Sequence, residues 1–243
     1  MVKLRTLIFL SGIFCYSFAH ADDLRLYLQE FTPFTHTDSK SGEFLGILTE
    51  KVAEIMRRSG QTYQFSSTSL ARGLNAAQSE ENACLFGFRR TPEREALYQW
   101  VGPLVSDNWV LYGRKSQHQR LNKFEESKPY LIGSYKNAAT GLQLTQQGYR
   151  INFANQDSDN PRLLSVGRID YWIVSELHGL ALAQQHQLDQ EIVKVVKYRH
   201  IDLYMLCNKN MEKSRIDLFN KFNKEIDNDG TMDKLLRKYQ VQK

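Results

Sequence analysis

Short apolar runs alternate along the chain with longer amphipathic stretches, which is the pattern of β-strands joined by α-helices. In the first part, runs at 24–28, 63–65 and 84–88 read as strands, and helical periodicity covers 47–60 and 70–78. A β-α-β-α-β order of this kind predicts an α/β fold with a parallel sheet and right-handed crossovers.

The same pattern restarts in the second half, which predicts a second lobe. Strand-like runs lie at 130–134, 149–153 and 169–174, with helices after position 137 and from 161. A strand at 203–207 and an amphipathic helix follow, and Gly230 separates that helix from a last one that ends near Tyr239.

The first 21 residues have the pattern of a secretory signal peptide. Lys3 and Arg5 give the positive end, an apolar core runs over 7–18, and Ala19-His20-Ala21 is a small-residue cleavage site. The apolar core is shorter than the roughly 20 residues that a membrane span requires. We therefore expect an exported, periplasmic protein that begins near Asp22.

The net charge and the distribution of basic residues do not favour a nucleic acid as the partner of this protein. Loss of the signal removes two basic residues and no acidic one, so the net charge falls from +5 to +3. Basic residues are scattered among acidic ones rather than gathered in a stripe. About 220 mature residues suit two small lobes or one large domain, and we expect a monomer.

Two cysteines remain after processing, and each lies in an apolar strand-like run. In an oxidising compartment Cys84 and Cys207 can form a disulfide, and the alternative is two buried free thiols that behave as small hydrophobes. No histidine has metal-ligand spacing beside Cys or carboxylate partners, so no metal and no cofactor is expected.

The segment 84–103, CLFGFRRTPEREALYQWVGP, joins a strand to a Thr-Pro-Glu-Arg turn and a second apolar run. Guanidiniums gather where the carboxyl end of the strand would open to solvent, which is where α/β proteins bind small ligands. The T-x-E-R-E signature at 91–95 and the Trp-x-Gly-Pro run at 100–103 resemble the extracellular solute-binding proteins of family 3, periplasmic receptors of polar amino acid uptake systems.

Further matching pieces extend the resemblance over essentially the whole mature chain. They are Pro33-Phe34, Gly46 before the first helix, 167–170 and 229–231. The resemblance implies the two-lobe type II periplasmic binding protein fold, with a mostly parallel sheet flanked by helices in each lobe and two hinge crossovers. It implies lobe 1 at 22–108, to which 201–243 returns, and lobe 2 at 109–200.

The resemblance also implies a carboxylate-binding residue, Arg94, in the position where the family's Arg grips the ligand α-carboxylate. An Arg fork offers a carboxylate two parallel donors. The Thr91 hydroxyl and the backbone near Gly87 and Arg89 would complete the cradle. The alternative is a surface pair between Arg94 and Glu93.

Three further arginines lie near this turn, namely Arg72, Arg89 and Arg90, and they exceed what one carboxylate requires. We expect one more of them to face the cleft.

The sequence departs from the family at the position of the ammonium-binding Asp. By alignment Ser175 falls there, with Glu176 next to it. A shift of one residue would restore a carboxylate, whereas Glu176 can instead favour the start of a helix. If no carboxylate faces the cleft, the ligand needs no ammonium group.

Other candidates would shape the walls of the cleft. Phe31, Phe34 and Trp109 can press on the hydrocarbon part of a ligand or belong to the core. Glu30 could meet a cationic side chain. In lobe 2, a helix begins after Ser134, and its amides could receive an anionic group on closure, with the residues Asn137 and Thr140 at its start.

The function expected from these features is a periplasmic receptor that closes on a small polar solute, an amino acid or related carboxylate. Its partner would be the permease of an ABC transporter. A second possibility is a receptor that presents its ligand to a membrane sensor. A third is a periplasmic dehydratase on the same fold, with Glu176 or Glu30 as the acid, although no nucleophile and base pair or phosphate loop favours an enzyme.

Overall fold

The computed structural model describes residues 23–116, 121–136 and 138–239. The expected signal peptide at 1–21 and the candidate Asn137 lie outside these residues. Within the described ranges, no helix is both long enough and apolar enough to span a bilayer.

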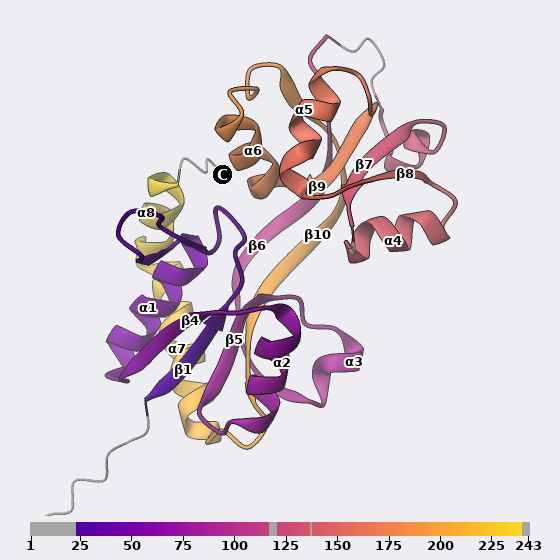
Figure 1. Cartoon of the computed structure of the whole chain (residues 1–243). Coiled ribbons are helices and arrows are strands. Elements are labelled where there is room, and N and C mark those ends of the chain that lie inside the picture. The colour runs from indigo at the N-terminus through magenta and orange to yellow at the C-terminus, as the bar shows by residue number, and fades with distance from the viewer. Residues whose placement is uncertain (1–22, 117–120, 137, 240–243) are drawn as a thin grey trace, which may run out of the picture.

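Lobe 1, the lower half of Figure 1, contains the three parallel strands β4, β1 and β5, with helices on both faces of their sheet. Helices α1, α7 and α8 lie on one side of this sheet, and α2 and α3 lie on the other. Its elements are β1 (Leu24–Leu28), β2 (His36–Thr37), β3 (Phe44–Leu45), α1 (Ile47–Ser59), β4 (Tyr63–Ser67), α2 (Leu70–Ser79), β5 (Ala83–Phe88), α3 (Pro92–Glu95), α7 (Lys213–Asn228) and α8 (Thr231–Lys238).

Lobe 2, the upper half of Figure 1, repeats the plan, with α5 and α6 on one side of its sheet and α4 on the other. Its elements are two 3-10 helices, η1 (Phe124–Ser127) and η2 (Asp157–Asp159), with β7 (Leu131–Tyr135), α4 (Ala139–Gln146), β8 (Arg150–Ala154), α5 (Asn160–Ser165), β9 (Tyr171–Ser175) and α6 (Glu176–Gln185).

Two long strands, β6 (Tyr98–Arg114) and β10 (Ile192–Asn208), run from one lobe to the other. They pair antiparallel over their whole length, from Tyr98 opposite Asn208 to Arg114 opposite Ile192. The result is one eight-stranded sheet in the order β4-β1-β5-β10-β6-β9-β7-β8. The predicted fold class is confirmed. The strand predicted at 203–207 is present as the last part of the 17-residue strand β10, so its length was underestimated.

Helix α1 is fixed in place at its first turn. Gly46 precedes it with φ 121°, and an added Cβ would lie 2.3 Å from the carbonyl oxygen of Phe34. Only glycine tolerates both conditions. One turn later, Lys51 is fully buried, and its ammonium donates to the Leu104 carbonyl at 2.6 Å and pairs with Asp227 at 2.6 Å. This buried charge therefore ties α1 to the hinge strand β6 and to α7.

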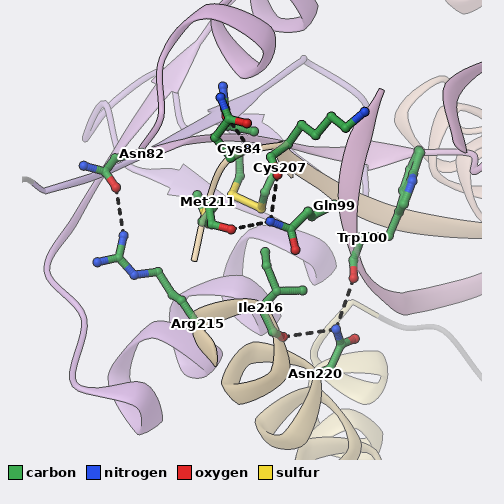
Figure 2. Close-up of a disulfide and its surroundings, with 12 residues drawn as sticks. Asn82, Cys84, Gln99, Trp100, Cys207, Met211, Arg215, Ile216 and Asn220 are labelled. Atoms are coloured by element: carbon green, nitrogen blue, oxygen red, sulfur yellow. Dashed lines mark hydrogen bonds between the residues drawn. A yellow bond between two sulfur atoms is a disulfide. The ribbon is translucent and has the colours of Figure 1, made fainter. Parts of the chain in front are cut away.

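A disulfide joins Cys84 of the lobe 1 strand β5 to Cys207 of β10, the strand that returns from lobe 2 (Figure 2). The two residues are opposite each other in the antiparallel pair and are fully buried in the lobe 1 core. The sequence left a bridge and two free thiols open, and the structure has the bridge. It closes a loop that contains the whole of lobe 2.

Polar contacts surround the disulfide and attach α7 to the base of β6. The side-chain amide of Asn220 donates to the carbonyls of Trp100 and Ile216, both at 3.1 Å, and its oxygen accepts the Gly102 N–H at 3.0 Å. Arg215 donates to Asn82 at 2.8 Å. These contacts hold the returning C-terminal helices to lobe 1.

We expect removal of the bridge to destabilise the protein, because a crosslink over so long a loop restricts the unfolded chain. The variant Cys84→Ala with Cys207→Ala should lose about 2 to 4 kcal/mol of the free energy of unfolding, measured by urea denaturation. The wild-type protein, reduced while unfolded and then refolded with reductant, keeps both side chains and is the control. Equal urea midpoints for its oxidised and reduced forms would contradict the prediction.

Candidate functional site

The carboxyl ends of the parallel strands of both lobes point toward the junction between them. Strand β5 is antiparallel to β10, and β9 is antiparallel to β6, so β5 runs toward lobe 2 and β9 runs toward lobe 1. Residues that follow β1, β5, β7 and β9 therefore meet beside the hinge strands. This is the position at which open α/β sheets bind ligands.

Three guanidiniums gather at this junction, from Arg89 after β5, Arg94 in α3 and Arg199 in β10. Burial lowers the pKa of Arg89, and the positive charges of Arg199 and Arg94 lower it further. Among the described residues no carboxylate forms an ion pair with any of the three. Glu93 is exposed and senses the charge of Arg94 without forming an ion pair with it.

Arg90 has a different environment from its neighbours. Its guanidinium pairs with Glu95 and lies 5.7 Å from the ring centre of Trp100 and 6.0 Å from that of Tyr204. Glu95 neutralises the Arg90 guanidinium and the two rings pack against it. We therefore assign Arg90 to the packing of lobe 1 and not to ligand binding.

A cavity of about 650 Å³ lies between α3 and the hinge strand β10, and Arg94 is not among its lining residues. Arg89, Thr91 and Arg199 line it, together with His200 and Asp202 of β10. Asp202 accepts a hydrogen bond from Ser106 at 2.6 Å and contacts His200 at 3.0 Å. The cavity is therefore strongly basic, and the described acids on its rim are already engaged.

Arg199 was not predicted from the sequence. It follows a register shift of β10 between Lys197 and Arg199, and such bulges re-aim side chains near functional sites. Its guanidinium donates to the Gln143 side-chain oxygen at 3.3 Å and to the Thr140 hydroxyl at 3.4 Å, both in α4. No local motif marks this position. Only the pairing of the long strands brings it to the junction.

A row of polar side chains crosses three strands at the junction. Arg199 of β10 is opposite Trp109 of β6, and Trp109 is opposite Ser175 of β9, so the three side chains share one face. The Nε of Arg199, the Nε1 of Trp109 and the Oγ of Ser175 are all buried without a hydrogen-bond partner. Buried polar atoms of this kind normally find partners, so the row is suited to a ligand.

Glu176, the alternative carboxylate, is held away from the arginines. Its side chain pairs with Lys194 and accepts a hydrogen bond from Asn108 at 3.2 Å. It lines a separate cavity of about 500 Å³ between the start of α6 and the helices α7 and α8. Glu176 therefore begins α6, as one of its two sequence interpretations proposed.

Asp107 of β6 lines the same second cavity and is only 5% exposed. Its oxygens accept the backbone N–H groups of Asn108 at 2.7 Å and Leu177 at 3.3 Å. The Ser175 hydroxyl comes close enough to lower the pKa of Asp107 but does not reach hydrogen-bonding geometry. Burial outweighs these contacts and raises the pKa to about 6.

Several sequence candidates have structural partners. Phe34 is fully buried in the lobe 1 core, and its ring stacks on that of Phe31 with 5.1 Å between the ring centres. It therefore supports Phe31 from below and has no exposed surface for a ligand. Glu30 accepts hydrogen bonds from Thr37 and Ser67. Arg72 is exposed and donates to Ser69 at 3.3 Å.

Two further candidates in lobe 2 lie where α4 packs on β7, Ser134 in the strand and Thr140 in the helix. Ser134 is 1% exposed, and a Cβ on Gly141 would lie 2.6 Å from its hydroxyl, so the helix lies directly on it. Thr140 is also buried, and its contact with Arg199 connects α4 to the hinge.

The lobes contact each other directly through His178 of α6. Its ring lies 4.6 Å from that of Phe31, and its Nδ1 contacts the Thr32 carbonyl of lobe 1. Its Nε2 lies 3.6 Å from Asp157, which Trp172 holds through a 2.8 Å hydrogen bond. Burial lowers the pKa of His178 and raises the pKa of Asp157.

Comparison with protein families gives a match over residues 26–242 to the bacterial extracellular solute-binding proteins, family 3. The chain belongs to this family. Among curated protein sequences, none matches this family 3 chain.

Solved structures share the fold of this family 3 protein. A histidine kinase sensor domain with similarity to periplasmic binding proteins has a TM-score of 0.74 and 16% identity, and the alignment covers 90% of this chain and 96% of that one. A mutant of ArgBP from T. maritima has a TM-score of 0.71 and 17% identity, with coverage of 90% and 95%. The ancestral amino acid-binding protein AncCDT-1, a precursor of cyclohexadienyl dehydratase, has a TM-score of 0.71 and 19% identity, with coverage of 89% and 95%.

A pH-dependent stability follows from Asp107. Because burial raises its folded-state pKa from 3.8 to about 6, its contribution favours folding at low pH and is lost as the pH rises through about 6. Asp107→Asn should therefore gain stability relative to wild type between pH 4 and pH 8, by about 2 kcal/mol. Urea denaturation at both pH values measures this, with the exposed Asp217→Asn as control. A gain that is the same at both pH values would contradict it.

A looser junction follows from loss of the interlobe contact. His178→Ala removes the ring that packs on Phe31 and the contact with the Thr32 carbonyl, so the lobes should separate more readily. We expect a larger radius of gyration in small-angle X-ray scattering without ligand. His186→Ala, at the other end of α6, is the control. An unchanged radius for His178→Ala would show that this contact does not hold the lobes together.

Proposed function

We propose that this family 3 protein is a periplasmic receptor that closes around a small polar solute carrying a carboxylate, an amino acid or a related acid. The observation that supports this most strongly is the group of three guanidiniums, Arg89, Arg94 and Arg199, at the junction of the lobes without a carboxylate partner. A guanidinium is the preferred protein group for a desolvated carboxylate. In this proposal Arg94 grips the carboxylate, and Thr91 and Arg89 complete the cradle.

The energetics favour binding by both lobes together. One charge-assisted hydrogen bond contributes roughly 1.5 to 3 kcal/mol, whereas micromolar affinity requires about 8 kcal/mol. Arg94 alone is therefore insufficient. Closure brings α4 and the Arg199 side chain toward the arginines of lobe 1, and it excludes water from the contacts.

The proposed setting is the periplasm, reached through the signal at 1–21, with delivery of the solute to the permease of an ABC transporter. The proposed receptor acts as a monomer with one ligand between lobe 1 at 22–108 plus 201–243 and lobe 2 at 109–200. A membrane sensor is the second candidate partner. It is favoured by the similarity in fold to a histidine kinase sensor domain.

Binding rather than catalysis is proposed for the junction, because the two candidate acids are engaged elsewhere. Glu176 pairs with Lys194, and Glu30 accepts hydrogen bonds from Thr37 and Ser67. Turnover of prephenate or arogenate by the purified protein, followed by product absorbance, would contradict this assignment.

Loss of Arg94 tests the site. In a thermal-shift panel, a ligand at 100 times its dissociation constant adds about 2.7 kcal/mol, which raises the melting temperature by about 5 to 10 °C. For each ligand found, Arg94→Ala should weaken binding about 30-fold or more by calorimetry, since a desolvated charge loses its partner.

The matched control is Arg237→Ala, which removes the same charge from an exposed position in α8. It should leave affinity unchanged, and both variants should keep the circular dichroism spectrum of the wild type. Full affinity in Arg94→Ala would refute the proposed site.

A further inference from the structure

The charge balance of the arginine cluster points beyond a simple carboxylate. The positive charges of Arg199 and Arg94 add to the effect of burial in lowering the pKa of Arg89, so the three guanidiniums interact as one electrostatic group. A zwitterionic amino acid has no net charge and would leave that group fully positive. A ligand with two negative charges would neutralise most of it.

Of the described residues that line the cavity of the cluster, the two acids are already engaged and leave no free carboxylate for a ligand ammonium. Glu95 pairs with Arg90, and Asp202 accepts hydrogen bonds from Ser106. Glu176 pairs with Lys194, and both oxygens of Asp107 accept backbone N–H groups. In addition, Asp107 and Glu176 line the second cavity and do not line the one that contains Arg89 and Arg199.

Arg199 has capacity left for a second anionic group. Its contacts with α4 are long, at 3.3 and 3.4 Å, and both are made to uncharged oxygens. Its Nε is buried without a partner. The neighbouring Trp109 Nε1 in the same row is also an unpartnered donor. A buried donor of this kind gains most from an anionic acceptor.

On the proposed function of a solute receptor, we infer that the ligand is a small organic dianion, with one anionic group held by Arg94 and Arg89 and the second by Arg199. The ligand needs no ammonium group, because the described acids that line the cavity of the cluster, Glu95 and Asp202, already have partners. Arg199 would then determine specificity. It lies in a hinge strand and contacts α4, so the second anionic group would connect both lobes.

The test measures dissociation constants by calorimetry for matched pairs of acids. Succinate and 2-oxoglutarate are dianions, and L-aspartate and L-glutamate are the same carbon chains with an ammonium group. Phosphoglycolate tests whether the second anionic group can be a phosphate. L-Glutamine, which lacks the second negative charge, is the control for that charge. We expect at least one dianion to bind ten times more tightly than its amino acid counterpart.

Variants on β10 separate the role of Arg199 from a general loss of charge. Arg199→Gln should weaken the dianion tenfold or more, and Arg199→Lys should restore part of that loss. Lys197→Gln removes one charge from an exposed position two residues away on the same strand and should change affinity less than twofold.

The outcomes separate this inference from the proposed function. If L-glutamine or another amino acid binds as tightly as its dianion, and Arg94→Ala abolishes that binding while Arg199→Gln does not change it, the receptor function stands and the dianion inference fails. If no acid in the panel binds, both fail. Binding of phosphoglycolate alone supports the inference and identifies the second group as a phosphate.

Discussion

The antiparallel pairing of β6 with β10 is the constraint on which the rest of the structure depends. Each strand crosses from one lobe to the other, and each is flanked by a strand of one lobe, β5 beside β10 and β9 beside β6. Relative motion of the lobes must therefore bend or twist this pair, since breaking it would expose buried backbone groups. Its lower end is fixed by the Cys84–Cys207 bridge, and Lys51 holds α1 and α7 against β6.

The same pair gathers the polar groups of the junction. Arg199, Trp109 and Ser175 share one face only because β10, β6 and β9 are in register. Each presents a buried polar atom without a partner, and unpartnered buried groups of this kind cost roughly 1 to 3 kcal/mol. On the proposed function, the solute supplies these partners, whereas Asp107 and Glu176 nearby already have partners within the protein.

The sequence predicted local elements well because their determinants are local. Apolar alternation over 24–28 and 84–88 and the glycines that flank α1 are sufficient to place those elements. The length of β10 was underestimated because it depends on pairing with β6, which lies far away in the sequence. The place of Arg199 at the junction and the pairing of the two cysteines depend on the register between segments that are distant in sequence. The burial of Phe34 depends on which side of its loop packs against the core. No local sequence pattern predicts any of these three features.

On the proposed function, closure of the lobes and the charge of the ligand are linked through Arg89, Arg94 and Arg199. Bringing Arg199 and α4 toward Arg89 and Arg94 concentrates positive charge, and burial already lowers the pKa of Arg89. A ligand shifts the equilibrium between open and closed forms only by its difference in affinity for the two. On the proposed function, an anion held between the lobes provides that difference, because it offsets the repulsion among the three guanidiniums. On the proposed function, the cations that bind the solute also oppose closure without it, so an empty receptor would be distinguishable from a loaded one by its partner in the membrane.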